Sequence, residues 1–417
     1  MQEYNNDPSD NESVIDQGDY DFTTWRKNAR YFYNTALAHV LQWPSLTCQY
    51  LPIYDNREDT NIVYQKLILG TQSTEEDNHL YISKVKLPNQ RMKDEFSKKK
   101  FSIVQPKDGL VKEGSNCVEL ETSILHPGEV VKARAKLNAY NIVGTKSSDG
   151  NVYIFDYSKQ PTKPKDNIFK PLMVLPSENE GWGLDWKPNG HSIISSDDKG
   201  HIYIWDIEKS KILETMDNET NRFDPTTNFI YPLNDFQYKE APITDIKYHK
   251  YHPSLFGSVS GTDLHIWDER QGFEKPFFDV TVHGKEVYSL DFSYHDEYLL
   301  LTTGEDTFIK MWDMRNLNLP IYKFKHGEQS AVKVEWNPKE ESIFATCGED
   351  KKVNVWDCTK ITDSDHNIQN NCLAFHHCGH TGAVNDFSWN PYVSLGIASV
   401  DAENNLQIWE MNETFFE

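Results

Sequence analysis

The stretch AVKVEWNPKEESIFATCGEDKKVNVWD, residues 331–357, shows the pattern that decides the fold of this chain. Apolar and polar residues alternate over 332–336 and again over 353–356, with an Asn-Pro turn, an apolar run and a Gly-Glu-Asp turn between them. Alternation with a period of two places one side of each strand inward. The stretch therefore predicts three short strands, joined by tight turns, that end at Trp356-Asp357.

The same ending recurs along the chain, at intervals of 50, 62, 45, 44 and 53 residues. The six aromatic–acid pairs are Phe155-Asp156, Trp205-Asp206, Trp267-Asp268, Trp312-Asp313, Trp356-Asp357 and Trp409-Glu410. A period of about 40–45 residues that closes on Trp-Asp is typical of β-propeller blades. A further expected hairpin, over 66–70 and 80–85, lacks this ending and raises the number of blades to seven. We predict an all-β, seven-bladed WD40 propeller over residues 43–417.

Three aspartates recur six residues before the closing aromatic of their repeats. They are Asp149, Asp306 and Asp350. An aspartate in a tight turn accepts hydrogen bonds from local backbone N–H groups. We therefore interpret these acids as structural rather than catalytic.

The chain before the first blade is expected to hold an acidic arm and one helix. Residues 1–18 are polar and acidic, as disordered segments are. Apolar residues then recur every three or four positions from Phe22 to Val40, which is the helical period. Residues 19–42 are predicted to form an α-helix that ends before Trp43-Pro44, because a residue before proline leaves the helical region.

A ring of seven sheets avoids exposed edges only if its last blade is completed. We expect the strand over 45–51 to pair with the blade that ends at Trp409. The N-terminal helix would then pack against the outside of this last blade.

The chain is strongly acidic, with 42 Lys and Arg, 64 Asp and Glu, and a net charge of −22. This charge disfavours direct binding of DNA or RNA and favours basic proteins as partners, although acidity also serves solubility alone. No run of 18 apolar residues is present and the first 21 residues carry seven acids without Lys or Arg, so neither a membrane span nor a signal peptide is expected. The six cysteines lack framework spacing, which predicts reduced thiols in the cytosol or nucleus.

No catalytic or cofactor motif is recognisable in the chain, so we expect no enzyme activity and no cofactor. The cluster Cys372, His376, His377, Cys378 and His380 contains zinc-ligand types. Strand alternation would send neighbouring side chains to opposite faces, and Gly379-His380 falls where propeller repeats commonly carry a Gly-His turn. No metal site is therefore predicted.

One repeated position predicts a peptide site at a mouth of the central channel. Glu129, Glu180 and Glu286 occupy the same place before the first strand of three blades, and two residues later stand Val131, Trp182 and Tyr288. Carboxylates beside aromatic rings suit an arginine or lysine side chain. The alternative is a merely polar rim.

The helix carries a second signal. Tyr31 and Phe32 are adjacent and Leu37 lies off the apolar stripe, so a single buried face cannot cover them all. An apolar residue on an outer flank suggests a groove for an amphipathic helix. The alternative is a helix that its own protein buries on two sides.

These segments resemble a known family. Trp25-Arg-Lys-Asn28, Trp43-Pro-Ser-Leu-Thr47, Leu67-Ile-Leu-Gly-Thr71 and Asn385-Asp-Phe-Ser-Trp-Asn-Pro391 are similar to the histone-binding Trp-Asp-repeat proteins first known as retinoblastoma-associated proteins, also called the Msi-like family. The resemblance covers the chain from about residue 19. It implies a groove between the N-terminal helix and a sixth-blade loop for the first helix of histone H4, and a channel mouth for the tail of histone H3.

The residues predicted for the two sites follow from these signals and the resemblance. The H4 groove comprises Tyr31, Phe32, Leu37, Asp363, Asp365, Phe375 and His376. The H3-tail or basic-peptide site comprises Glu129, Glu180, Trp182, Glu286, Tyr288, Glu403 and Asn404. The sixth-blade loop is shorter and less acidic than is usual in the family.

The leading hypothesis is a non-catalytic H3–H4-binding subunit or chaperone of nuclear chromatin complexes, with a possible cytoplasmic pool. Its expected partners are histones H3 and H4 and subunits of assembly, acetyltransferase, deacetylase or Polycomb-type complexes, without nucleic acid or membrane. The alternative is a general WD-repeat adaptor, such as a ubiquitin-ligase substrate receptor.

Overall fold

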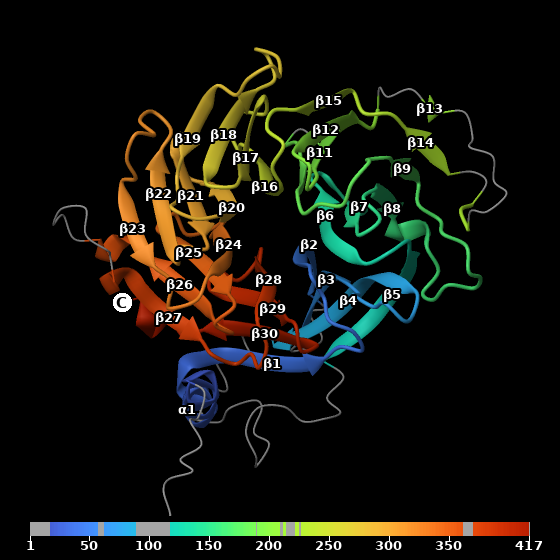
Figure 1. Cartoon of the computed structure of the whole chain (residues 1–417). Helices are drawn as coiled ribbons and strands as arrows, with labels where there is room; N and C mark the ends of the chain where they lie inside the picture. Colours follow the sequence, from blue (N-terminus) through green and yellow to red (C-terminus); the bar gives the residue numbers. More distant parts are fainter. Residues whose placement is uncertain are drawn as a thin grey trace, which may run out of the picture.

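Seven four-stranded blades form a closed ring in the computed structural model of the chain (Figure 1). The structure describes residues 17–56, 62–88, 117–188, 190–208, 212–213, 222–224, 227–361 and 370–416. Within each blade the first strand in sequence lies innermost, and neighbouring strands pair antiparallel. The seven-bladed WD40 propeller expected from the repeats is confirmed.

The blades follow one another along the chain. Blade 1 comprises β2 (Cys48–Asn56), β3 (Ile62–Gly70), β4 (Asn78–Pro88) and β5 (Val118–His126). Blade 2 comprises β6 (Val130–Lys136), β7 (Ala139–Ser147), β8 (Val152–Asp156) and β9 (Met173–Leu175). Blade 3 comprises β10 (Leu184–Trp186), β11 (Ser192–Ser196), β12 (His201–Asp206) and β15 (Asn234–Gln237). Blade 4 comprises β16 (Ile243–Tyr248), β17 (Leu255–Ser260), β18 (Asp263–Asp268) and β19 (Phe278–Thr281).

The remaining blades complete the ring. Blade 5 comprises β20 (Val287–Phe292), β21 (Leu299–Gly304), β22 (Phe308–Asp313) and β23 (Tyr322–Lys325). Blade 6 comprises β24 (Ala331–Trp336), β25 (Ile343–Gly348), β26 (Val353–Asp357) and β27 (Leu373–His377). Blade 7 comprises β28 (Val384–Trp389), β29 (Gly396–Asp401), β30 (Asn405–Met411) and, as its outer strand, β1 (Tyr33–Val40).

Short elements complete the described fold. The 3-10 turns are η1 (Tyr157–Lys159), η2 (Cys358–Lys360), η3 (Asn370–Cys372) and η4 (Glu413–Phe415). The segment between β12 and β15 adds β13 (Ile212–Leu213) and β14 (Asn228–Ile230) to the outer edge of blade 2, where β14 runs parallel to β9. Blade 2 thereby becomes a six-stranded sheet, and its edge strand β9 is covered.

The N-terminal helix is shorter than predicted. Helix α1 spans Gln17–Phe32, and the rest of the segment predicted as helix, up to residue 42, contains strand β1. β1 pairs antiparallel with β30, with Leu37 opposite Ile408. The helical period fails here because β30 would otherwise leave a row of backbone N–H and C=O groups unpaired, and pairing them outweighs local helical preference.

The strand expected to close the ring was also placed wrongly. The segment over 45–51 leads into β2, the inner strand of blade 1, which pairs with β3. It does touch blade 7, where the N–H of Cys48 donates to Asp386 Oδ2 at 2.8 Å and the N–H of Tyr50 donates to Ser388 Oγ at 3.0 Å. These bonds join neighbouring blades through side chains rather than through a strand ladder.

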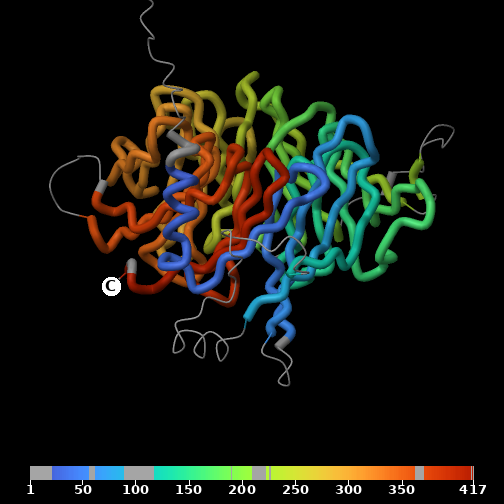
Figure 2. The backbone as a smooth tube through the Cα atoms, turned by 90° about the horizontal axis from the view of Figure 1, so that it is seen from below, coloured from blue at the N-terminus to red at the C-terminus, as the bar shows by residue number. Residues whose placement is uncertain are grey.

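Helix α1 stands against the outer wall of the ring (Figure 2). Trp25 and Ala29 form its buried stripe, with Phe32 half-buried at its end. Asp21 Oδ2 lies 2.6 Å from Lys352 Nζ in the turn between β25 and β26. The helix therefore contacts blade 6 as well as the last blade on which it was expected to pack.

The turn aspartates are structural, as predicted, and each has an additional partner. Asp306 Oδ1 accepts the N–H of Phe308 at 3.2 Å and lies 2.8 Å from His283 Nδ1. His283 Nε2 contacts Thr302 Oγ1 at 2.8 Å, and Thr302 accepts the indole N–H of Trp312 at 2.9 Å. This chain ties the inter-blade turn to the closing Trp of the blade, so the recurring Trp-Asp ending is part of the scaffold.

Ion pairs cross the central channel. Lys132 of blade 2 reaches Asp245 of blade 4 at 2.7 Å, because blade 3 offers only Gly183 at the corresponding position. Asp386 of blade 7 lies 2.6 Å from Lys333 of blade 6 and 3.3 Å from Arg134 of blade 2. All of these groups except Gly183 are mostly removed from water. The channel interior is therefore filled by paired charges.

Candidate functional site

Helix α1 is fixed to the propeller by a buried polar chain, here called the α1 anchor: Trp25, Tyr33, His377 and Gln407. The indole N–H of Trp25 donates to Tyr33 Oη at 2.6 Å, and Tyr33 Oη lies 2.7 Å from His377 Nδ1. His377 Nε2 lies 2.8 Å from Gln407 Oε1. Since Tyr33 accepts from Trp25, its own hydrogen donates to His377 Nδ1, so the imidazole carries its hydrogen on Nε2.

The environment of His377 favours its neutral form. Its ring stacks on Trp409 with the centroids 4.3 Å apart. Burial lowers the pKa of His377 well below its ordinary value, and the neighbouring His380 adds to this shift. The neutral ring can accept from Tyr33 and donate to Gln407 at once, so the anchor is fully hydrogen-bonded at neutral pH.

The predicted H4 groove is assembled in part by the described residues. The Phe32 ring, at the C-terminal end of α1, meets the edge of Phe375 of β27 with the centroids 6.5 Å apart. Tyr31 is 59% exposed beside this contact. His376 points to the exposed side of β27, whereas Phe375 points into the core, as strand alternation requires. Asp363 and Asp365 lie outside the described residues.

Leu37 is the exception in this set. It belongs to β1 rather than to α1, and it packs in the apolar cluster between blades 7 and 1 that includes Leu406 and Ile408. The prediction that it flanks a groove on the helix was wrong, because the segment is a strand and its side chain covers a seam of the ring.

The three repeated glutamates do occupy equivalent positions. The carbonyls of Glu129, Glu180 and Glu286 accept N–H groups from the neighbouring turns of their own blades, at 3.1, 2.9 and 2.8 Å respectively. These residues precede the inner strands and therefore share one face of the ring. Trp182 is 54% exposed on that face, and Tyr288 is half-buried.

Glu403 and Asn404 lie in the turn between β29 and β30, on the same face. Asp401 organises this turn, since its Oδ1 accepts the N–H of Glu403 at 2.9 Å. Asn404 has φ of 66°, a left-handed conformation that asparagine tolerates better than most residues. The identity of Asn404 thus has a backbone reason that is independent of any ligand.

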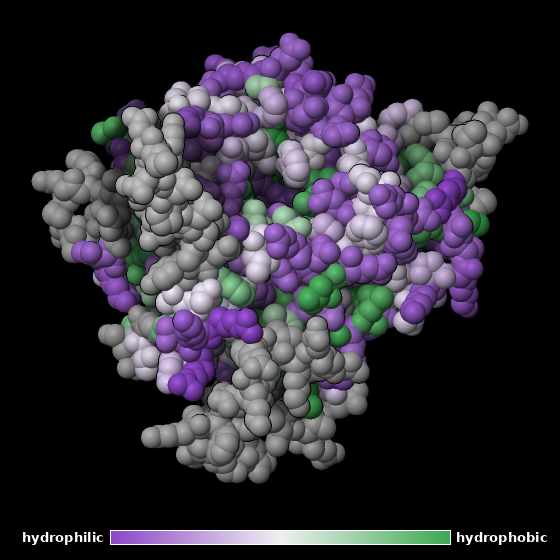
Figure 3. Space-filling view, turned by 60° about the horizontal axis from the view of Figure 1, so that its bottom comes forward, coloured by the Kyte–Doolittle hydropathy of each residue, from purple (hydrophilic) through white to green (hydrophobic). Residues whose placement is uncertain are grey.

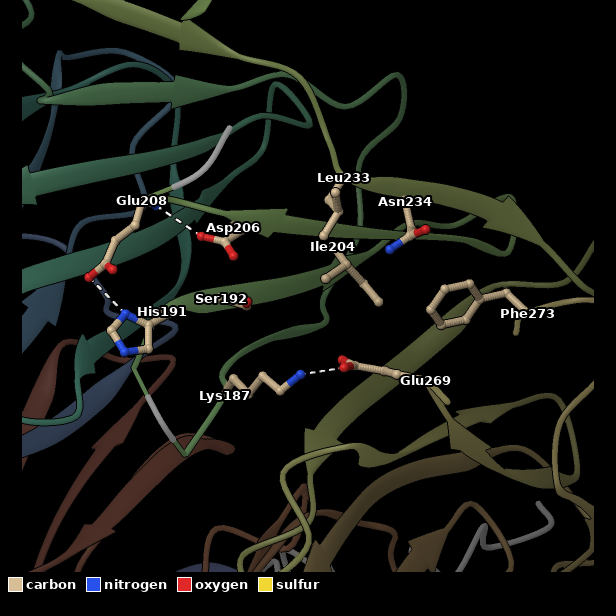
Figure 4. A pocket seen from close by; sticks show the side chains of 10 residues that line it. All are labelled: Lys187, His191, Ser192, Ile204, Asp206, Glu208, Leu233, Asn234, Glu269 and Phe273. Atoms are coloured by element: carbon tan, nitrogen blue, oxygen red, sulfur yellow. Dashed lines mark hydrogen bonds and ion pairs between the residues drawn. The ribbon is translucent and has the colours of Figure 1, made fainter. Parts of the chain in front are cut away.

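A cavity of about 500 Å³ lies between blades 3 and 4 (Figure 4). Ile204, Leu233 and Phe273 form its apolar side, and the ion pairs Lys187–Glu269 and His191–Glu208 border the rest. None of the predicted site residues lines it. Its charged side chains pair with one another, so the cavity offers no separate set of groups for chemistry.

One group among the described residues has the types and proximity of metal ligands: Asp263, His265 and Asp279. Lys239 Nζ lies 2.9 Å from Asp263 and 3.1 Å from Asp279, so the chain itself supplies a cation to both carboxylates. The cysteine and histidine cluster considered in the sequence is dispersed: Cys372 lies in the apolar core, His377 in the α1 anchor and His380 against Asp401 at 2.9 Å.

Sequence reasoning missed the α1 anchor. Its members come from α1, β1, β27 and β30, which are far apart along the chain. A buried Trp, Tyr, His and Gln carry no spacing signal until the strands are paired. The histidines that bond the turn aspartates were only partly visible, through the Gly-His dipeptide at 379–380.

The visible surface in Figure 3 is mostly hydrophilic, with hydrophobic residues in small separate patches. Among the helices of the described part of the chain, none has the length and apolarity needed to cross a membrane.

Two family models match the chain. Residues 21–89 match the model that describes the histone-binding protein RBBP4 and its counterpart in the CAF1 complex. Residues 169–206, 274–313 and 319–357 match the model of the WD domain, G-beta repeat. The first match covers most of α1, the closing strand β1 and the first three strands of blade 1, which is the part of the chain that lacks the Trp-Asp ending.

Proposed function

We propose a function from the premise that this chain is a histone-binding WD-repeat protein of the RBBP4 and Msi-like family. It binds histone H4 beside α1 and a basic tail such as that of histone H3 at the channel mouth. The observation that carries this proposal is that the segment matching the histone-binding model is the one that forms α1 and closes the ring.

The H4 site lies between α1 and blade 6. Phe32 and Phe375 supply an apolar floor, and Tyr31 is exposed at its side. An amphipathic helix buries its apolar stripe in such a groove. The α1 anchor and the Asp21–Lys352 pair hold the helix that forms one wall, so little ordering is needed when the partner binds.

The tail site lies across the mouth. Glu129, Glu180 and Glu286 share one face, and the exposed Trp182 supplies a ring face for a cation. Because paired charges fill the channel beneath, a bound tail lies along the surface instead of threading through the ring. The net charge of −22 speeds encounter with basic histones.

An H4 first-helix peptide tests the groove. Calorimetry should give micromolar binding or tighter to the wild-type chain, and Phe32→Asp should abolish it because a carboxylate replaces the apolar floor. Tyr31→Asp, at an exposed position, should weaken binding without affecting the fold.

The matched control for the groove is Tyr231→Asp, since Tyr231 is equally exposed but lies in the segment between β14 and β15. It should bind the H4 peptide as the wild type does. Equal binding by the wild type, Tyr31→Asp and Phe32→Asp would sink the groove assignment.

The proposed setting is the nucleus, in complexes that assemble or modify chromatin. Affinity purification from nuclear extract should recover histones H3 and H4 with chromatin enzymes. Recovery of ubiquitin-ligase scaffold proteins without histones would instead favour the general adaptor.

A further inference from the structure

A second cavity, of about 300 Å³, lies at the seam where blade 7 meets blade 1 and is here called the seam cavity. The residues that matter for its chemistry are Thr35, Tyr50, Tyr54, Tyr392, Trp409 and Glu410. Tyr50 lies near the end of its inner strand, and Tyr392 follows the end of β28. The mouth glutamates precede the inner strands, so the seam cavity opens toward the opposite face of the ring.

Aromatic rings form much of its wall. The rings of Tyr54 and Tyr392 lie 4.7 Å apart at an angle of 44° and are 44% and 37% exposed. Trp409 and Tyr50 lie deeper, at 1% and 4% exposure. Ring faces of this kind attract a cation that has left water.

The deep end carries an unsatisfied polar atom. The Tyr50 hydroxyl is buried and has no hydrogen-bond partner among the described residues. The Asn390 amide lies beside it but is bonded to Gln65 at 2.7 Å. A buried hydroxyl without a partner costs about 1–3 kcal/mol, so a ligand with a polar hydrogen has something to gain here.

Glu410 adds a carboxylate to the same lining. The acid that ends other blades caps the following turn, as Asp156 does for Ser158 and Asp357 does for Thr359. Glu410 instead accepts from Thr35 Oγ1 at 3.4 Å and borders the cavity. Burial raises the pKa of Tyr50, and the Glu410 carboxylate adds to that shift, which places the two groups close together.

No side chain of opposite charge balances this carboxylate within the lining. The described residues that border the cavity include one acid and no Lys, Arg or His. A neutral apolar occupant would leave both Glu410 and the Tyr50 hydroxyl unsatisfied. A cation with N–H donors would satisfy both and would also contact the rings.

We propose that the seam cavity binds the primary ammonium group of a lysine side chain that a protein partner presents to this face. The ammonium donates to Tyr50 Oη and to Glu410, and its alkyl stem lies against Tyr54 and Tyr392. The site stands apart from the H4 groove and the channel mouth and does not depend on either.

Saturation-transfer NMR with Nα-acetyl-lysine N-methylamide on the full chain tests this site. The lysine analogue should bind in the millimolar range. The norleucine analogue, which has the same stem without the charge, should not bind. An arginine analogue that binds more tightly than the lysine analogue would overturn the choice of a primary ammonium.

Three variants locate the binding. Glu410→Gln and Tyr392→Leu should each weaken the lysine analogue several-fold, and Tyr231→Leu should not. Tyr50→Phe should weaken binding while leaving the unliganded chain at least as thermally stable, because it removes the unpartnered hydroxyl.

Two further results keep the test separate from the histone proposal. Tyr31→Asp should retain binding of the lysine analogue, and Glu410→Gln should retain binding of the H4 peptide. The proposal is wrong if the lysine analogue does not bind, if the norleucine analogue binds equally well, or if Glu410→Gln and Tyr50→Phe bind as the wild type does.

Discussion

At the scale of single residues, the same residue type has different work in different blades. His283 and His380 bond turn aspartates, whereas His377 bonds the tyrosine that holds α1. The Trp-Asp endings are likewise scaffold, since Trp312 and Asp306 are joined through Thr302 and His283. A residue that is freely exposed and repeated, such as Glu180 beside Trp182, is therefore a better candidate for recognition.

Substitutions at the mouth test that distinction. Glu180→Gln together with Trp182→Ala should weaken binding of a basic H3-tail peptide about tenfold or more, because a charge-assisted contact and a cation–π contact are lost, each worth about 1 kcal/mol. Fluorescence anisotropy at two salt concentrations measures the change.

Glu208→Gln is the control for the mouth, since Glu208 lies at the other end of its blade, in the cavity between blades 3 and 4. Its tail affinity should equal that of the wild type. A double mouth variant that binds the tail unchanged would show that Glu180 and Trp182 belong to a polar rim.

At the scale of elements, the decisive feature is the change from helix to strand at Phe32 and Tyr33. β1 gives blade 7 its outer strand, and α1 is delivered to the outer wall by that strand. The ring closure and the proposed H4 groove therefore depend on one continuous segment. Loss of β1 pairing would release the helix as well.

Leu37→Ala tests the role of β1. Its side chain packs in the seam between blades 7 and 1, so the variant should lower the free energy of unfolding by about 2 kcal/mol. Val40→Ala, on the same strand but 72% exposed, should change it by less than about 0.5 kcal/mol. Chemical denaturation gives both values.

The same variant separates two interpretations of Leu37. If Leu37 belongs to the seam, folded Leu37→Ala binds the H4 peptide as the wild type does. A large loss of H4 affinity without a loss of stability would return Leu37 to the groove.

At the scale of the whole molecule, charges that cross the channel connect blades that are not neighbours. Asp386 joins blade 7 to blades 6 and 2 through Lys333 and Arg134. Burial opposes the ionised form of Asp386, but the charges of Lys333 and Arg134 outweigh it and lower its pKa to about 2. A ring whose centre is tied in this way depends on a carboxylate that acid removes.

The pH dependence follows from the direction of that shift. The folded pKa of Asp386 lies below its ordinary value of 3.8, so its contribution is present above that value and is lost as the pH falls toward 2. The contribution amounts to about 2 kcal/mol. Asp386→Asn should therefore be less stable than the wild type at neutral pH, and the difference should shrink between pH 4 and 2.

Thermal melting against pH measures this difference. Asp166→Asn is the control, since Asp166 pairs with Lys170 at the exposed surface and should affect stability little. A stability gap for Asp386→Asn that stays constant down to pH 2 would contradict the assignment.

The sequence alone determined the propeller, its seven blades and the equivalence of the three mouth glutamates. These features repeat at a fixed period, and each repeat folds by local alternation and turn chemistry, so they can be read without knowing the neighbours. The helical stripe through Trp25 and Ala29 was readable for the same reason.

Only the tertiary structure decided how the ring closes and what holds α1. The segment 33–40 has helical spacing, yet it is a strand because the edge of β30 needs hydrogen-bond partners that only this segment supplies. The α1 anchor and the seam cavity unite residues hundreds of positions apart. Their chemistry arises from contacts that exist only after the first and last strands meet, so no local pattern could reveal it.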